Sequence, residues 1–164
     1  MNDETKKTNL KLWESVEKTP EDLIEKVDAG DGKKLNSIPA INRFKKATEV
    51  FGVYGDKWGL KEIKHTELHI NNLAIGNLQA VFFYTHNDKE ISFEISNSIS
   101  ILFWEDGKPK ANVNYRKSIE TDTVTKALSK LGFNADIYSD SDLIEGTIKK
   151  DELSIDDIVK IEEG

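Results

Sequence analysis

The sequence predicts an α+β fold, an antiparallel β-meander flanked by two helices. Stretches rich in Ile, Phe, Val, Tyr and Trp follow one another between residues 58 and 104. No segment of helical length separates them, so neighbouring strands are expected to pair antiparallel. Apolar residues at helical spacing precede and follow this region. At 164 residues the chain is long enough for one hydrophobic core, and two independent domains would be crowded.

The first helix is predicted just before the strands. Ser37 is the expected N-cap, and Pro39 suits the first helical turn. Gly52 is expected to stop the helix, and residues 52–57 to turn into the strands. The positions that recur at helical spacing are Ile41, Phe44, Ala47 or Thr48, and Phe51.

Four strands are expected, at about residues 58–69, 78–85, 90–96 and 99–104. Asn71-Asn72 and Gly76-Asn77 are expected to form the first connection, and residues 86–89 a short hairpin loop. Residues 106–109, which begin Asp-Gly, are expected to end the meander.

The second helix is predicted from about Asn114 to Leu131, closed by Gly132. Four apolar residues at spacings of three and four define its buried stripe, namely Val124, Ala127, Leu128 and Leu131.

These elements suggest three parts: a polar N-terminal arm (residues 1–34), a core domain (35–138) and an acidic C-terminal tail (139–164). Within the arm, residues 26–34 contain two glycines and read as a loop. A short apolar stripe is also expected there, made of Leu10, Leu12, Trp13 and Val16. The chain begins with polar residues rather than a signal-peptide pattern, and it lacks the roughly 20-residue apolar run of a membrane span. We therefore expect a cytoplasmic protein with no membrane association.

The net charge of −7 is unevenly distributed. Residues 134–164 carry three lysines and ten carboxylates, a balance of −7. Residues 35–133 carry 13 basic and 11 acidic side chains, a balance of +2. The acidic C-terminal segment thus masks, in the net charge, a mildly basic middle region. A nucleic-acid interface is expected in that middle region.

The sequence offers no pattern for enzymatic chemistry. Cysteine is absent, which removes disulfides, thiolate metal sites and cysteine nucleophiles. Neither a phosphate-binding G-x-x-x-x-G-K-[ST] loop nor a G-x-S-x-G nucleophile elbow occurs. His65 and His69 are expected on a strand, where residues four apart stand about 13 Å from each other, too far for one metal. A nuclease using acidic residues such as Asp140 and Asp142 is a weaker alternative. We expect no enzyme activity, no metal and no cofactor.

Basic residues are the remaining candidates for function. Cations along a helix and a neighbouring hairpin can follow a phosphate backbone, with a salt-dependent affinity. The alternative interpretation is an ordinary solvated surface. The candidates on the two helices and around the first strand are Arg43, Lys45, Lys46, Lys57, Lys61, Lys64, Lys108, Lys110, Arg116, Lys117, Lys126 and Lys130.

Two segments resemble the single-strand annealing superfamily typified by the eukaryotic protein Rad fifty-two and its phage relatives of the Erf and Sak type. Residues 115–135 look like its signature helix: an Arg-Lys pair, Thr-Asp, a basic residue before Ala-Leu, then an apolar residue, Gly and Asn. Residues 41–60 are similar to phage proteins with a T-E-x-F-G…W-G pattern. The resemblance covers roughly residues 10–140 in outline and about 45 residues in motif.

This resemblance implies a β-β-β-α core that assembles side by side into a ring or filament, with single-stranded DNA in an outer basic groove. Lys126 matches a DNA-contacting position, and Arg116 and Lys117 match the pair before it. Thr125 and Ser129 stand where the family has two further basic residues, which implies fewer phosphate contacts. The complete set of residues expected to bind DNA is Arg43, Lys57, Lys61, Arg116, Lys117, Lys126 and Lys130.

The expected function is therefore ATP-independent annealing of complementary single strands in phage-type homologous recombination. The alternative is an interaction module, such as an inhibitor, that keeps the scaffold and binds another protein. The acidic tail is expected either to compete with DNA for the groove or to recruit a host or phage replication protein. The expected partners are thus single-stranded DNA, further copies of this chain and such a replication protein.

Overall fold

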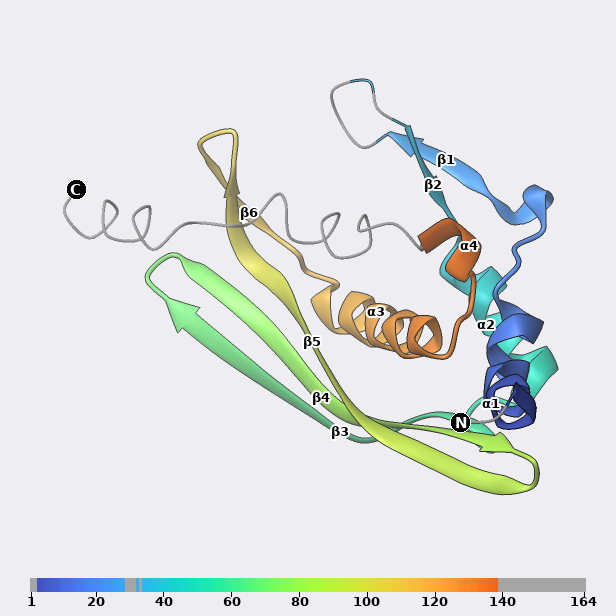
Figure 1. Cartoon of the computed structure of the whole chain (residues 1–164). Coiled ribbons are helices and arrows are strands. Elements are labelled where there is room, and N and C mark those ends of the chain that lie inside the picture. The colour runs from blue at the N-terminus through green and yellow to red at the C-terminus, as the bar shows by residue number, and fades with distance from the viewer. Residues whose placement is uncertain (1–2, 29–31, 33, 139–164) are drawn as a thin grey trace.

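The computed structural model describes residues 3–28, 32 and 34–138 (Figure 1). It shows a long, curled antiparallel sheet with a helix lying across it, which confirms the predicted α+β class. The predicted acidic tail, residues 139–164, lies outside the described residues. The elements in chain order are α1 (Asp3–Val16), the 3-10 helix η1 (Glu21–Leu23), β1 (Glu25–Asp28), β2 (Lys34–Ser37), α2 (Ala40–Phe51), β3 (Trp58–Ile70), β4 (Leu73–His86), β5 (Lys89–Glu105), β6 (Lys108–Ala111), α3 (Tyr115–Lys130) and α4 (Ala135–Tyr138).

Strands β3 to β6 form the predicted meander, paired antiparallel in chain order. Two residues connect each pair of neighbouring strands. In the turn between β4 and β5, Asn87 and Asp88 both have positive φ, 50° and 58°. Asparagine and aspartate tolerate this left-handed conformation, which two-residue turns of type I′ require. The predicted hairpin at residues 86–89 is therefore confirmed.

Three details of the predicted strands are wrong. The stretches 90–96 and 99–104 are one strand, β5, because Asn97 and Ser98 at the predicted break pair with Leu78 and Asn77 of β4. Strand β4 begins at Leu73, so Gly76-Asn77 lies inside it. A Cβ atom at Gly76 would stand 2.9 Å from the ring of Tyr115, so this glycine serves close packing rather than a turn. The prediction that residues 106–109 end the meander is also wrong, because residues 106–107 turn into a further strand, β6, that pairs with β5.

The core lies between the helices and one face of the sheet, called here the inner face. Alternate residues of β4 point to it and are buried, including Leu78, Ala80 and Phe82. At the start of β3, Trp58 is completely buried, and its indole Nε1 donates a hydrogen bond to the Gly52 carbonyl at 2.9 Å. Four aromatic rings surround it, those of Phe44, Phe51, Tyr54 and Phe82.

The two predicted helices are present, with small changes at their ends. Ser37 belongs to β2 and Pro39 directly precedes α2, so the predicted N-cap at Ser37 is wrong. Gly52 ends α2 with φ 108°, as expected. Of the predicted stripe of α3, Leu131 is half-buried while three members are buried: Val124, Ala127 and Leu128.

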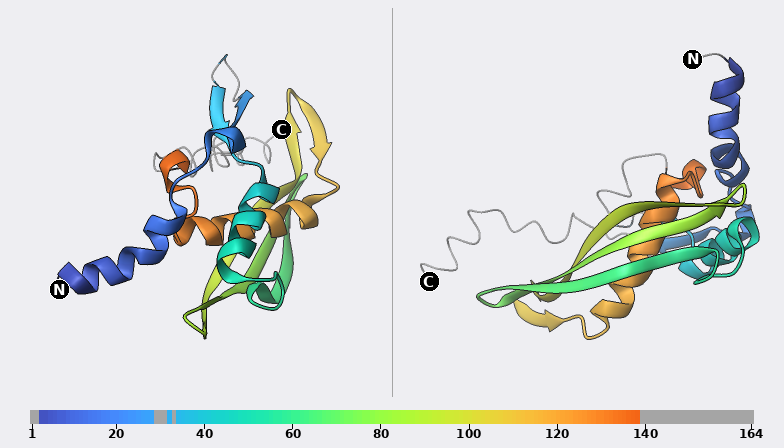
Figure 2. Two further views of the ribbon diagram at one scale, coloured as in Figure 1. Left: turned by 90° about the vertical axis from the view of Figure 1, so that its right-hand side faces the viewer. Right: turned by 90° about the horizontal axis from the view of Figure 1, so that it is seen from below.

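The N-terminal arm is attached to the core by residues near its middle. Helix α1 extends away from the sheet (Figure 2), and Val16 at its end is buried in the core. Backbone amides of Asn134 and Asp136 donate to the carbonyls of Val16 and Glu17. The predicted loop at residues 26–34 is partly wrong, because β1 and β2 pair as a two-stranded antiparallel sheet there. Few apolar residues mark these short strands, which explains why composition indicated a loop.

Gly132 ends α3, and the ring of Trp13 from α1 packs directly against it. Its φ is 95°, its amide bonds the Ser129 carbonyl, and the Phe133 amide bonds the Leu128 carbonyl, which together form a Schellman motif. A Cβ atom at Gly132 would lie 2.5 Å from the Trp13 ring. The position therefore requires glycine for two separate reasons.

Replacing Gly132 with alanine is expected to lower the free energy of unfolding by about 2–4 kcal/mol, since backbone strain and overlap with Trp13 add up. Gly107→Ala is the matched control: φ is 71° there, but no atom lies within 4 Å of the added Cβ. We expect a loss of only about 1 kcal/mol for the control. Urea denaturation of both variants measures the difference. Equal losses would mean that Trp13 does not rest on Gly132 in solution.

Candidate nucleic-acid interface

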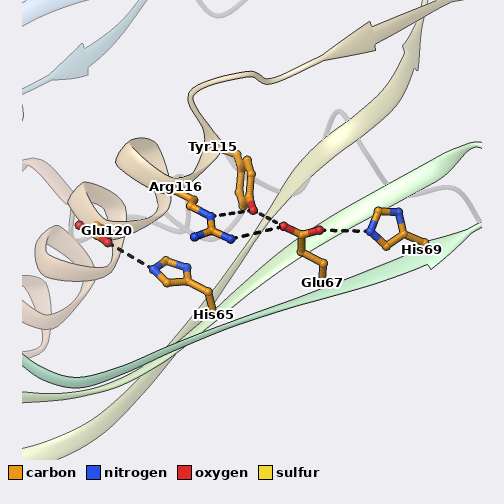
Figure 3. A network of polar contacts seen from close by, with 6 residues as sticks. All are labelled: His65, Glu67, His69, Tyr115, Arg116 and Glu120. Atoms are coloured by element: carbon orange, nitrogen blue, oxygen red, sulfur yellow. Dashed lines mark hydrogen bonds and ion pairs between the residues drawn. The ribbon is translucent and has the colours of Figure 1, made fainter.

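The N-terminal end of α3 is joined to β3 by a network of polar side chains (Figure 3). Tyr115 at the first position of the helix donates its hydroxyl to the Glu67 carboxylate on the inner face of the sheet. Arg116 donates from Nε to the Tyr115 hydroxyl at 3.0 Å, and its Nη2 stands 3.8 Å from Glu67. Arg116, expected to contact DNA, is thus held by groups of its own chain.

The charges in this network stabilise one another. The hydrogen bond from Tyr115 is the main reason that the pKa of Glu67 lies below its ordinary value, and His69 and Arg116 lower it further. The same tyrosine, together with the carboxylates of Glu67 and Glu120, raises the pKa of Arg116. Both groups are exposed, so water weakens these interactions.

The histidines of β3 take part in the network. His69 Nε2 lies 3.2 Å from a Glu67 oxygen, and His65 Nε2 lies 3.3 Å from Glu120 on α3 (Figure 3). Both histidines lie in β3, as the prediction of a strand required. Within residues 3–28, 32 and 34–138 no group of three or more histidine or carboxylate side chains is arranged to hold a metal ion.

Tyr115→Phe is expected to raise the pKa of Glu67 toward its ordinary value of 4.5, because the main hydrogen bond to the carboxylate is lost. A carboxyl whose pKa is lowered by folding stabilises the fold above its unfolded pKa, and this contribution disappears as the pH falls through the folded pKa. The wild type should therefore lose stability below about pH 4.5, and the variant should lose less over the same range. NMR titration of the Glu67 carboxyl carbon tests this. An unchanged pKa in the variant would contradict the network.

Lys126 also has an acceptor within the chain. Its ammonium donates to the main-chain carbonyl of Ser96 in β5, at 2.8 Å. The side chain is exposed, and it reaches from the C-terminal half of α3 to the sheet. In this structure the lysine that matches the family's DNA-contacting position secures the helix to a strand.

Lys61 points to the other face of the sheet, called here the outer face. Its neighbour Leu60 packs against the core, and successive side chains of a strand point to opposite faces. The Lys61 ammonium lies 2.5 Å from a Glu90 oxygen and 5.1 Å from the centre of the Phe83 ring. Lys61 is therefore on the opposite side of the sheet from α3. Within one chain, Lys61 and the basic residues of α3 do not line the same groove.

Lys57 and Arg43 lie near the junction of α2 and β3. Lys57 is exposed, and its ammonium stands 3.8 Å from Asp56. Arg43 is buried on α2 and lies near Asp122 of α3. Burial raises the pKa of Asp122, and the charge of Arg43 partly offsets this increase. Arg43 is thus part of the helix packing rather than of an open surface.

All four predicted cations of α3 are exposed, and Lys117 and Lys130 differ from Arg116 and Lys126 in their partners. Among the described residues neither forms an ion pair with a carboxylate. They stand near opposite ends of the helix and, at about 100° per residue, roughly 140° apart around its axis, so they do not line a single face of α3. The structure thus places Arg116, Lys126 and Lys130 on one side of α3 and Lys117 on another, and it leaves Arg43 buried and Lys61 on the outer face.

Sequence reasoning missed the acceptors that hold these cations, above all Glu67 and the Ser96 carbonyl. The alternation of His65, Glu67 and His69 along one strand was a signal that all three share a face. Nothing in the sequence indicated that this face would meet the start of α3.

No protein-family model matches the chain, and no curated protein matches it either. Among the described residues, no helix has both the length and the apolar character required to cross a membrane.

Proposed function

We propose that this chain binds single-stranded DNA and promotes annealing of complementary strands as a self-assembling, cytoplasmic, phage-type recombination protein. One observation carries the proposal. The segment that resembles the annealing signature, residues 115–135, contains α3, which packs across the inner face of a β-meander and leaves Lys117 and Lys130 exposed. A β-β-β-α core with basic residues on its helix is the arrangement that the resemblance implies.

The proposed mechanism needs no bond to be made or broken. Exposed lysines hold phosphates, and the base edges stay free to test for complementarity. Base pairing itself then selects the partner strand, so sequence preference is low and no ATP is required. In this mechanism further copies of the chain extend the row of phosphate contacts, which offsets the small number of cations in one chain.

A second candidate is a protein-binding module, such as an inhibitor, built on the same scaffold. The chain carries a net charge of −7. Five of the seven residues expected to bind DNA interact with acidic groups or acceptors of their own chain, which leaves fewer cations for phosphates: Arg43, Lys57, Lys61, Arg116 and Lys126.

A strand-annealing assay separates the two candidates. Two complementary labelled oligonucleotides are mixed at low salt without ATP, with and without the protein. Annealing at least about tenfold faster than the spontaneous reaction, for unrelated sequences alike, supports the first candidate. Spontaneous kinetics, with protein that elutes as one folded species, would contradict it and favour the second. Heat-denatured protein is the control for nonspecific charge effects.

The acidic tail is proposed to compete with DNA for the lysines of α3. Removing residues 140–164 takes away nine carboxylates and three lysines and should tighten binding of an oligothymidine at low salt. The gain should shrink as salt rises, because screening weakens the competition. Equal affinity of the full and the shortened chain at low salt would overturn competition and leave recruitment of a replication protein as the role of the tail.

A further inference from the structure

The sheet has two edges that are only partly covered. Strand β6 pairs with residues 102–105 of β5, and no described strand lies beside residues 89–100 on the side away from β4. Strand β3 pairs with β4 alone, and from Gly59 onward no described strand covers its other edge. Exposed strand edges are templates for pairing with another strand, and proteins usually protect them.

Lys126 sits on the partly covered edge of β5. Its ammonium donates to the Ser96 carbonyl at 2.8 Å, within the part of β5 that β6 leaves uncovered. Natural sheets use lysine in this way to discourage strand addition, because an incoming strand must displace a hydrated cation. A strand added here would have to take the place of Lys126.

The two edges carry opposite charges on the outer face. Lys61 and Lys64 project from β3, whereas Glu90 and Glu94 project from β5. Lys64 and Glu94 line the same shallow groove, of about 390 Å³, together with Gln79, Ser96 and Glu62, which lies at the bulge of β3. The opposite charges of the edges make β3 of one copy a suitable neighbour for β5 of another.

The direction of the strands also fits this pairing. Since β3 and β5 are each antiparallel to β4, they run in the same direction. A second copy in the same orientation therefore places its β3 parallel to β5 of the first and continues the sheet. Such a head-to-tail contact can be repeated, and it yields a ring or a filament depending on the rotation between copies.

We propose that the uncovered edge of β5 receives β3 of a second copy of this chain, and that Lys126 leaves Ser96 when it does. The location of the contact stands independently of DNA binding. The consequence for Lys126 rests on the proposed function: its released ammonium becomes available to a phosphate. Assembly then favours DNA binding, and by reciprocity DNA favours assembly.

Charge reversal with mixing tests the contact. One full-length variant carries Lys61→Glu and Lys64→Glu, and another carries Glu90→Lys and Glu94→Lys. Each alone places like charges on both edges, so each should stay small in sedimentation velocity at concentrations where the wild type assembles. An equimolar mixture restores opposite charges at every contact and should assemble. Variants that assemble alone like the wild type, or a mixture that stays small, would overturn the proposal. Circular dichroism and thermal unfolding establish that both variants are folded.

Lys126→Met tests whether Lys126 protects the β5 edge against strand addition. Lys130→Met is the matched control, because it removes an exposed lysine from the same helix. Without DNA, Lys126→Met should assemble at a concentration about tenfold lower than the wild type, and Lys130→Met at an unchanged one. Equal behaviour of the two variants would overturn this protective role of Lys126.

Failure of this inference and failure of the proposed function give different results. If mixing the variants restores assembly but the protein binds no DNA, the edge contact is supported and the proposed annealing function is contradicted. DNA binding by a wild type that never assembles would contradict the edge contact between copies. A strand from another protein would then be the candidate to pair with the β5 edge.

Discussion

Replacing Trp58 with alanine should lower the free energy of unfolding by about 3–5 kcal/mol, the usual loss when a fully buried aromatic side chain is truncated. Trp58 is completely buried, and it joins the end of α2 to the first strand through its hydrogen bond to the Gly52 carbonyl. A domain of this size has a total stability of roughly 5–15 kcal/mol. The variant is thus expected to be largely or partly unfolded at 37 °C.

Two further variants separate the causes of this loss. Trp58→Phe keeps an aromatic ring but removes the indole N–H, leaving the Gly52 carbonyl without this donor, and should cost about 1–3 kcal/mol. Trp104→Ala removes a tryptophan that is 49% exposed on β5 and should change stability by less than about 0.5 kcal/mol. Urea denaturation followed by circular dichroism measures all three. Equal losses for Trp58→Ala and Trp104→Ala would contradict the described core.

Replacing Lys117 and Lys130 together with alanine should weaken oligothymidine binding about 10–30-fold at low salt, because two phosphate contacts are lost. The slope of log affinity against log salt concentration should fall by about 1.4, since each contact with a single strand contributes about 0.7. Both side chains are exposed and carry no described ion pair, so stability should hardly change.

The matched control removes the same charge elsewhere. Lys11 of α1 and Lys18 just after it are exposed, and their double replacement with alanine should leave the salt slope unchanged. An equal loss of affinity in both double variants would indicate a general charge effect, and an intact slope in Lys117→Ala/Lys130→Ala would remove α3 from the interface.

Much of the fold could be predicted because local patterns and tertiary structure agree. The stripe of α3 and the glycine that ends it mark the helix within one residue of its bounds. The turn at Asn87-Asp88 combines two residues that tolerate positive φ. By contrast, Gly76 was interpreted from its usual role in turns, whereas contact with Tyr115, a residue 39 positions away along the chain, sets its role. Local patterns carry no information on such a contact.

The candidate site was less predictable for the same reason. A sequence shows which residues are cationic, but their acceptors come from other elements. Arg116 meets Glu67 only because α3 begins above β3, and Lys126 meets Ser96 only because α3 crosses β5. Arg43 has a side chain typical of a surface, and helix packing buries it. The predicted cations thus divide into Lys117 and Lys130, which form no described ion pair, and others held by groups of the chain. Except for Lys57, whose partner is the adjacent Asp56, tertiary contacts determine this division.

Binding of a fluorescent oligothymidine at low and at moderate salt, with the size of the complex measured in parallel, tests the central claim most directly. We expect tight binding at low salt that weakens as salt rises, by an assembly of many copies. No binding at low salt, from a folded protein that stays a monomer, would contradict it.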